Sequence, residues 1–164
     1  MRNSSILLLT YGKFLDLDER NPHLFLDGVS FVSQFIDLDS IYGFCWRDGV
    51  YSRVLIEEFR ELEDDIAIFG KDDMISMGNN FMLKLSGNNS AKLIKEYIKN
   101  VPTPFSKTEW LLINNIIEYF HKRNLHEYLS VSKLRNINDR MKRVSKNQIQ
   151  EALDRFNILA IHME

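Results

Sequence analysis

The sequence has little of what disulfide-bonded, membrane-spanning or nucleotide-binding proteins need. Its 164 residues include one cysteine, Cys45, which excludes an internal disulfide and a cysteine-based zinc site. The longest apolar run near the N-terminus, Ile6 to Leu9, is too short for a signal core or a membrane span. The sequence also has no GxxxxGK and no GxGxxG loop, so no nucleotide-binding cradle is expected. We therefore expect a soluble, cytoplasmic protein without a membrane partner.

Residues arranged for catalysis or metal binding are also scarce. His121 and His126 are five apart and do not share one helical face, and no HExxH motif occurs. Cys45 falls in the apolar stretch IYGFCW without a nearby histidine, so we expect an inert, buried thiol. Two carboxylate pairs flank expected turns, where they cap or solvate the chain: Asp16 with Asp18, and Asp37 with Asp39. We expect no catalytic residue, no metal ion and no cofactor, and thus a protein that is not an enzyme.

The composition is that of a globular protein with an uneven distribution of charge. Apolar residues make up 45%, aromatic residues 12% and charged residues 27%, enough for one ordinary domain or two small ones. Residues 1–100 hold 11 Lys and Arg against 16 Asp and Glu, whereas residues 101–164 hold 10 against 7. Within residues 121–148 the counts are 8 and 2. A polyanion is attracted by such a segment, although a solvated helix surface gives the same pattern.

Residues 1–100 predict an acidic unit of helices followed by a hairpin. We expect helices from Ser4 or Ser5 to Leu17, from His23 or Leu24 to Asp37, from Arg53 to Glu63 with Ser52 as its cap, and from Ser90 to Lys99. Strands are expected at Ile41–Trp46, Ile66–Phe69 and Phe81–Leu85, with Met74–Met77 left open. This order is typical of a winged-helix unit.

One stretch of this unit is similar to a known family. The string GFCWRDGVYSRVLIEEFRELEDDIAI, residues 43–68, resembles the signature of YwgA-like winged-helix proteins of bacteria and archaea. Residues 49–52, GVYS, stand where that family has GPYS, and Asp65-Ile66-Ala67 stand where it has a Gly-Leu-Ile strand. The resemblance covers residues 24–87 and implies a winged-helix fold. The turn proline and the basic residues of the family's preceding helix are missing, so we do not expect this unit to grip DNA.

Residues 101–164 predict a second, basic unit. The segment Val101-Pro102-Thr103-Pro104 is the expected boundary. Ser106 and Glu109 form a capping box that begins a helix to about Arg123, in which Trp110 belongs to the apolar, core-facing side. The fold class we expect is therefore mainly α with short β-hairpins (α+β), as two tandem winged-helix or helix-turn-helix-like units.

The end of this unit, residues 130–161, predicts a helix-turn-helix that runs into a strand. Ser132 is expected to cap a short helix and Ser145 a second one, with Ile149, Leu153 and Phe156 inward and a strand at Ile158–His162. Lys and Arg bind phosphates, while Asn and Gln amides pair with adenine. The candidate nucleic-acid-binding residues are Lys133, Arg135, Arg140, Lys142, Arg143, Lys146, Asn147 and Gln150.

Two functions follow from these patterns. The first is a non-enzymatic regulatory protein, prokaryotic or from a phage, that binds double-stranded DNA through the C-terminal unit. A homodimer with a two-fold contact would favour this function, whereas a monomer would favour the second. The second is a protein–protein adaptor or inhibitor, antitoxin-like or derived from a mobile element, that binds a nucleic-acid-processing protein. Its candidate partner-binding residues are Glu57, Glu58, Glu61, Asp64 and Asp65. A continuous basic patch around the second helix would favour the first function.

Overall fold

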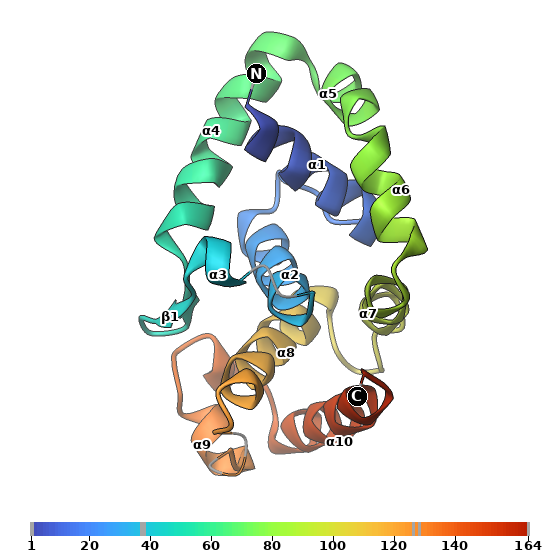
Figure 1. Cartoon of the computed structure of the whole chain (residues 1–164). Coiled ribbons are helices and arrows are strands. Elements are labelled where there is room, and N and C mark those ends of the chain that lie inside the picture. Colours follow the sequence, from blue (N-terminus) through green and yellow to red (C-terminus); the bar gives the residue numbers. More distant parts are fainter. Residues whose placement is uncertain (1, 37–38, 126, 128, 164) are drawn as a thin grey trace.

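The computed structural model describes residues 2–36, 39–125, 127 and 129–163. The helices are α1 (Asn3–Leu15), α2 (Pro22–Phe35), α3 (Asp39–Tyr42), α4 (Arg53–Phe69), α5 (Lys71–Met77), α6 (Asn79–Gly87), α7 (Asn89–Lys99), α8 (Lys107–Lys122), α9 (Val131–Arg135) and α10 (Lys146–Met163), with a 3-10 turn, η2 (Met141–Arg143), before α10. The strands β1 (Cys45–Trp46) and β2 (Val50–Tyr51) form an antiparallel hairpin. The described chain is thus mainly helical with one small sheet (Figure 1).

Helix α8 lies at the centre of the molecule beside α2 (Figure 1). The predicted capping box at its start is confirmed, since the amide of Glu109 donates to Ser106 Oγ at 3.1 Å and the amide of Ser106 donates to Glu109 Oε1 at 3.0 Å. Trp110 is fully buried, as predicted, and its indole N–H donates to the Tyr97 carbonyl. Because α2 and α8 come from the two predicted units, one core runs through both. The boundary at residues 101–104 stays a prediction.

The hairpin is anchored against the end of α8. Trp46 opposes Val50 in the register of the hairpin, and its ring packs on Tyr119 and Phe120 with centroids 5.7 and 5.3 Å apart. The turn between the strands contains Asp48 and Gly49, both with positive φ, which Asp tolerates and Gly adopts freely. The expected strand from Ile41 is only partly right, because residues 39–42 are helical and pairing begins at Cys45.

Three predicted strands are wrong, because each of these segments is helical. Residues 66–69 extend α4 up to Gly70, and residues 81–85 belong to α6, which begins at Asn79. Residues 158–162 continue α10, where Phe156 and Leu159, three apart, extend its buried side. Short apolar runs fit either a strand or a buried helix, and here packing against neighbouring helices decides for the helix. Met74–Met77, left open, forms part of α5.

Helix starts and ends differ slightly from the expectations. Ser52 caps α4 as predicted, accepting from the Leu55 amide. Neither Ser4 nor Ser5 caps α1, whose N-cap is Arg2, and the helix ends before Asp16, which has a φ of 56°. Pro22 begins α2, which suits the fixed φ of proline at a first helical position. The expected end of that helix at Asp37 lies outside the described residues.

Candidate functional site

The C-terminal segment forms a short helix and a long helix joined by residues 136–145. Ser130, not Ser132, caps α9, because Ser130 Oγ accepts from the Lys133 amide at 3.2 Å and Ser132 lies inside the helix. Ser145 caps α10 as predicted: its Oγ accepts from the Gln148 amide at 3.2 Å, and Gln148 Oε1 accepts from the Ser145 amide at 2.9 Å. The Ser145 cap and the buried side chains of α10 determine which side chains of its first turns point to solvent.

The buried face of α10 is the one that the sequence predicts. Ile149, Ala152 and Phe156 are fully buried, and Leu153 is half-buried. The joining segment is anchored too, since its own Met141 and Val144 are buried. The opposite face of the first turns of α10 therefore points to solvent.

Most of the predicted nucleic-acid-binding residues are exposed to solvent. The exposed ones are Lys133, Lys142, Arg143, Lys146, Asn147 and Gln150, whereas Arg135 and Arg140 are half-buried. Lys142 pairs with the exposed Asp139 at 3.1 Å, a contact that solvent screens strongly. Gln150 donates to Asp154 at 2.9 Å, so its amide is engaged within the helix. The exposed Lys142 and Arg143 thus come just before α10 along the chain, and Lys146 and Asn147 are exposed in its first turn.

Arg140 differs from the other candidates because it binds a carboxylate inside the protein. Its Nη2 lies 2.8 Å from Oδ2 of Asp27 on α2, whose side chain is only 13% exposed. Burial raises the pKa of Asp27, and Arg140 and a hydrogen bond from Asn115 oppose that rise. The nearby Asn138 donates to the Asp48 carbonyl at 3.2 Å and accepts from the Met141 amide. Arg140 therefore joins the segment before α10 to α2, and its role in nucleic-acid binding stays a prediction.

Beyond residue 157 the exposed face of α10 becomes apolar. The strand expected there is part of the helix, and Ile158 and Ile161 are 58% and 68% exposed. The predicted strand at residues 158–162 hid this apolar surface. Side chains alternate between the two sides of a strand, whereas Ile158 and Ile161, three residues apart, lie on the same side of a helix.

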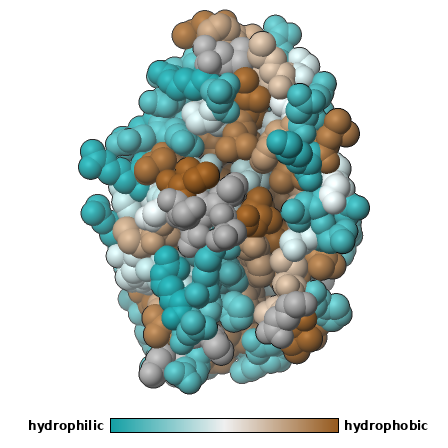
Figure 2. Space-filling view, viewed as in Figure 1, coloured by the Kyte–Doolittle hydropathy of each residue, from teal (hydrophilic) through white to brown (hydrophobic). Residues whose placement is uncertain are grey.

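The predicted partner-binding residues lie on α4, over which hydrophilic residues gather in Figure 2. Glu57 and Asp64 are exposed, while Glu58 and Glu61 are half-buried. Glu57 pairs with Arg53 at 3.0 Å and Glu61 with Arg2 at 3.4 Å, both solvent-screened. The pKa of Glu58 is raised, mainly by burial and to a smaller extent by the negative charge of the neighbouring Glu61.

Asp65, which was also predicted to bind a partner, is not part of that exposed surface. Its side chain is buried, and it accepts from Ser5 Oγ at 2.7 Å and from the Arg2 amide at 3.1 Å. The hydrogen bond from Ser5, followed by that from Arg2, holds the pKa of Asp65 below its usual value. Asp65 therefore fastens the start of α1 to α4.

Cys45 is exposed, so the prediction of a buried thiol is wrong. It lies in β1 next to Trp46, whose ring packs against the aromatic side chains of α8. Side chains alternate in a strand, so the thiol and the indole leave the hairpin on opposite sides.

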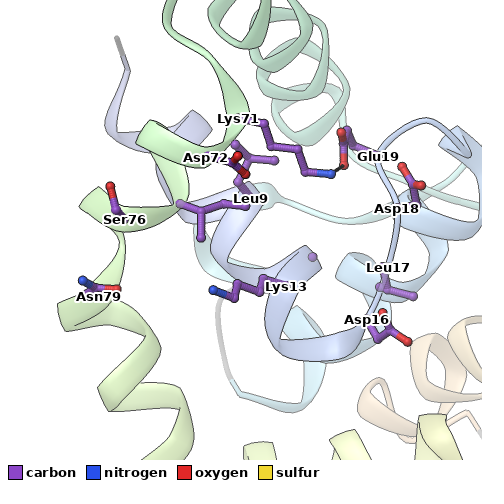
Figure 3. A pocket seen from close by; sticks show the side chains of 12 residues that line it. Leu9, Lys13, Asp16, Leu17, Asp18, Glu19, Lys71, Asp72, Ser76 and Asn79 are labelled. Carbon is purple, nitrogen blue, oxygen red and sulfur yellow. Dashed lines mark hydrogen bonds and ion pairs between the residues drawn. The ribbon is translucent and has the colours of Figure 1, made fainter.

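A polar cavity that the sequence did not predict lies where the α1–α2 turn faces α5. Its volume is about 570 Å³. In Figure 3, Lys71 from α5 reaches Glu19, and the ion pair between them measures 2.8 Å. Asp18 accepts from the Arg20 side chain, which lowers the pKa of the Asp18 carboxyl. The other lining side chains include Lys13, Asp16, Asp72, Ser76 and Asn79.

Lys71 and Glu19 neutralise each other and Asp18 pairs with Arg20, so these three side chains are engaged within the protein. Within the described ranges, no three His, Cys, Asp or Glu side chains gather as metal ligands do. His126, one of the histidines considered above, lies outside those ranges. In the same part of the chain, no helix has the length and hydropathy that crossing a bilayer requires.

Comparison with family models, curated proteins and solved structures finds no match to this chain. The resemblance of residues 24–87 to YwgA-like proteins therefore stays a prediction.

Proposed function

We propose that this chain is a non-enzymatic regulatory protein that binds duplex DNA through the exposed start of α10. One observation carries the proposal: the α10 caps and its buried face turn Lys146 and Asn147 outward, directly after the exposed Lys142 and Arg143. In a helix-turn-helix, the first residues of the second helix enter the major groove while flanking basic residues bind phosphates.

The helices α8, α9 and α10 would together form the helix-turn-helix unit, without a wing, since residues 158–163 continue α10. For the first unit, the hairpin and the Ser52-capped α4 fall where the YwgA-like resemblance puts a strand, a turn and a helix. The helical Asp65-Ile66-Ala67 departs from that pattern.

Binding to random duplex DNA across a salt series tests the proposal. The test variant is Arg143→Ala/Lys146→Ala, which leaves Arg140 and its ion pair intact. Each phosphate contact contributes about 0.9 to the slope of log K against log salt, so the variant should bind more weakly with a slope smaller by about 2. A Lys84→Ala/Lys92→Ala variant, which removes two exposed lysines of α6 and α7, is the matched control. Equal losses in both variants would show only a non-specific effect of net charge.

A second candidate function is an adaptor that binds a basic protein through α4. It is favoured by the exposed Glu63 and Asp64, followed on the same helix by Ile68, which is 72% exposed, and Phe69. An acidic surface beside exposed apolar side chains is typical of a protein interface. No DNA binding at low salt would favour this function. Loss of a partner complex in a Glu63→Lys/Asp64→Lys variant, but not in Arg143→Ala/Lys146→Ala, would support it directly.

A further inference from the structure

Four lysines from three helices line a cavity that neither proposed function uses. The cavity, about 410 Å³ in volume, lies between the C-terminal end of α1, the second half of α7 and the first residue of α8. Its lysines are Lys13, Lys95, Lys99 and Lys107, and the single acidic side chain among its lining residues is Asp16. These lysines lie up to 94 positions apart along the chain, so only the fold brings them together.

The positive charge of this cavity is not neutralised by ion pairs. Lys107 donates to the backbone carbonyl of Asp16 at 2.7 Å, and Lys95 lies over the Phe14 ring, 4.8 Å from its centroid. Both partners are formally neutral, so neither contact offsets the positive charge of the cavity. Lys13 and Lys99 make no ion pair with a carboxylate in the part of the chain that the structure describes. Four cations against one carboxylate leave a local excess of three positive charges.

We propose that this lysine cavity binds the phosphate groups of a polyphosphorylated ligand. Lysine binds phosphate as a point charge, and several ammonium groups around one hollow repel each other until a multivalent anion enters. The volume lies within the range of small-molecule sites, which supports a compact ligand such as a chain of linked phosphates. The same chemistry would also recognise consecutive phosphates of a nucleic acid, and the experiment below separates these two sources.

The lysine cavity is independent of the proposed DNA contact. Lys107 is the first of the 16 residues of α8, whereas α9 and α10 follow the other end of that helix. At 1.5 Å per residue the two ends are about 24 Å apart. None of the residues that line the lysine cavity belongs to α9, to the joining segment 136–145 or to α10. The variants that test the two proposals therefore share no residue, and the two proposals can fail separately.

Titration calorimetry with inorganic tripolyphosphate, at low ionic strength, tests the cavity directly. We expect the wild type to bind, and Lys13→Ala/Lys99→Ala to bind at least about tenfold more weakly, because each lost charge-assisted contact is worth a factor of this order. Both lysines are exposed and unpaired by carboxylates, so the variant should fold, which its circular dichroism and melting temperature verify. The control Lys84→Ala/Lys92→Ala removes two lysines outside the cavity and should bind as the wild type does.

A variant that gains affinity separates a loss of charge in the cavity from a loss of binding caused by a damaged fold. Asp16→Asn removes the one negative charge of the cavity and keeps a residue that tolerates the positive φ of this position. We expect it to bind tripolyphosphate several-fold more tightly than the wild type. Affinity that stays unchanged in both cavity variants, or falls equally in the control, would overturn the proposal.

Duplex DNA, titrated into the same variants, identifies the source of the phosphate. Tripolyphosphate binding that needs Lys13 and Lys99, with DNA binding that does not, would assign the cavity to a free phosphorylated ligand. DNA binding that needs both lysines, without tripolyphosphate binding, would assign it to a nucleic-acid backbone. If neither probe depends on these lysines, the proposal is wrong.

Discussion

Replacing Arg140 by alanine should destabilise the fold, although the sequence grouped Arg140 with the DNA-binding residues. The change leaves Asp27, 13% exposed, without its cationic partner at 2.8 Å. Removing one member of a fully buried ion pair costs about 3–5 kcal/mol. Arg140 is itself 38% exposed, and the burial-raised pKa of Asp27 helps the carboxyl to take up a proton. We therefore expect a loss of about 2 kcal/mol at pH 7, or roughly 4–8 °C in melting temperature for a chain of this size.

The pH dependence of this loss follows from the raised pKa of Asp27. A carboxyl whose pKa is higher in the folded state than in the unfolded state binds more protons when folded. Its ionisation therefore lowers stability as the pH rises from the unfolded pKa, about 4, through the folded one. Without Arg140 the folded pKa rises further, so the variant should lose most at neutral pH and little near pH 4.

Denaturant unfolding of four proteins at pH 4 and pH 7 measures this effect: wild type, Arg140→Ala, Asp27→Asn and the double variant. Because the asparagine side chain introduced by Asp27→Asn carries no charge, the double variant should recover much of the stability that Arg140→Ala loses at pH 7. An equal loss at both pH values, or a double variant no more stable than Arg140→Ala, would refute the argument that the uncompensated carboxylate is the cause.

Three further predictions concern other contacts. Asp65→Asn should lower the free energy of unfolding at pH 7, because it weakens the contact between α1 and α4. The pKa of Asp65 is lowered in the folded state, so its contribution to wild-type stability should be lost as the pH falls below about 4; denaturant unfolding across this range should show a smaller loss of stability in the variant. Ser52→Ala removes the cap of α4 and should cost about 1 kcal/mol in denaturant unfolding, against no change for the exposed Ser76→Ala, whose hydroxyl is not a helix cap. Gly28→Ala should lower the melting temperature, because a Cβ there would lie 2.3 Å from Cδ1 of the buried Leu17, and this overpacking outweighs the gain of about 1 kcal/mol in helix propensity; an unchanged or higher melting temperature would contradict this.

Local features of the fold were predictable from the sequence. Ser52, Ser106 and Ser145 cap helices through residues only three positions away, so the signal lies within a few letters of sequence. The apolar spacing of α8 was equally clear. The strands expected at residues 66–69, 81–85 and 158–162 failed because a short apolar run suits both states, and contacts between distant helices decide which forms.

The candidate sites were predictable only where function depends on neighbouring residues. The exposed, basic start of α10 follows from its cap and its periodicity. Arg140 could not be separated from the other cations, because its partner Asp27 lies 113 positions away on α2. The lysine cavity likewise exists only because the ends of α1, α7 and α8 meet. Charge counts along the chain show an excess but not which charges are already paired.

The measurement that tests the central claim most directly is the salt-dependent binding of duplex DNA by wild type and Arg143→Ala/Lys146→Ala. The proposed function predicts wild-type binding that weakens steeply with salt, and a variant with lower affinity and a slope smaller by about 2, while its melting temperature is unchanged. Wild-type protein that does not bind DNA at low salt, or a variant that binds with wild-type affinity and slope, would contradict it.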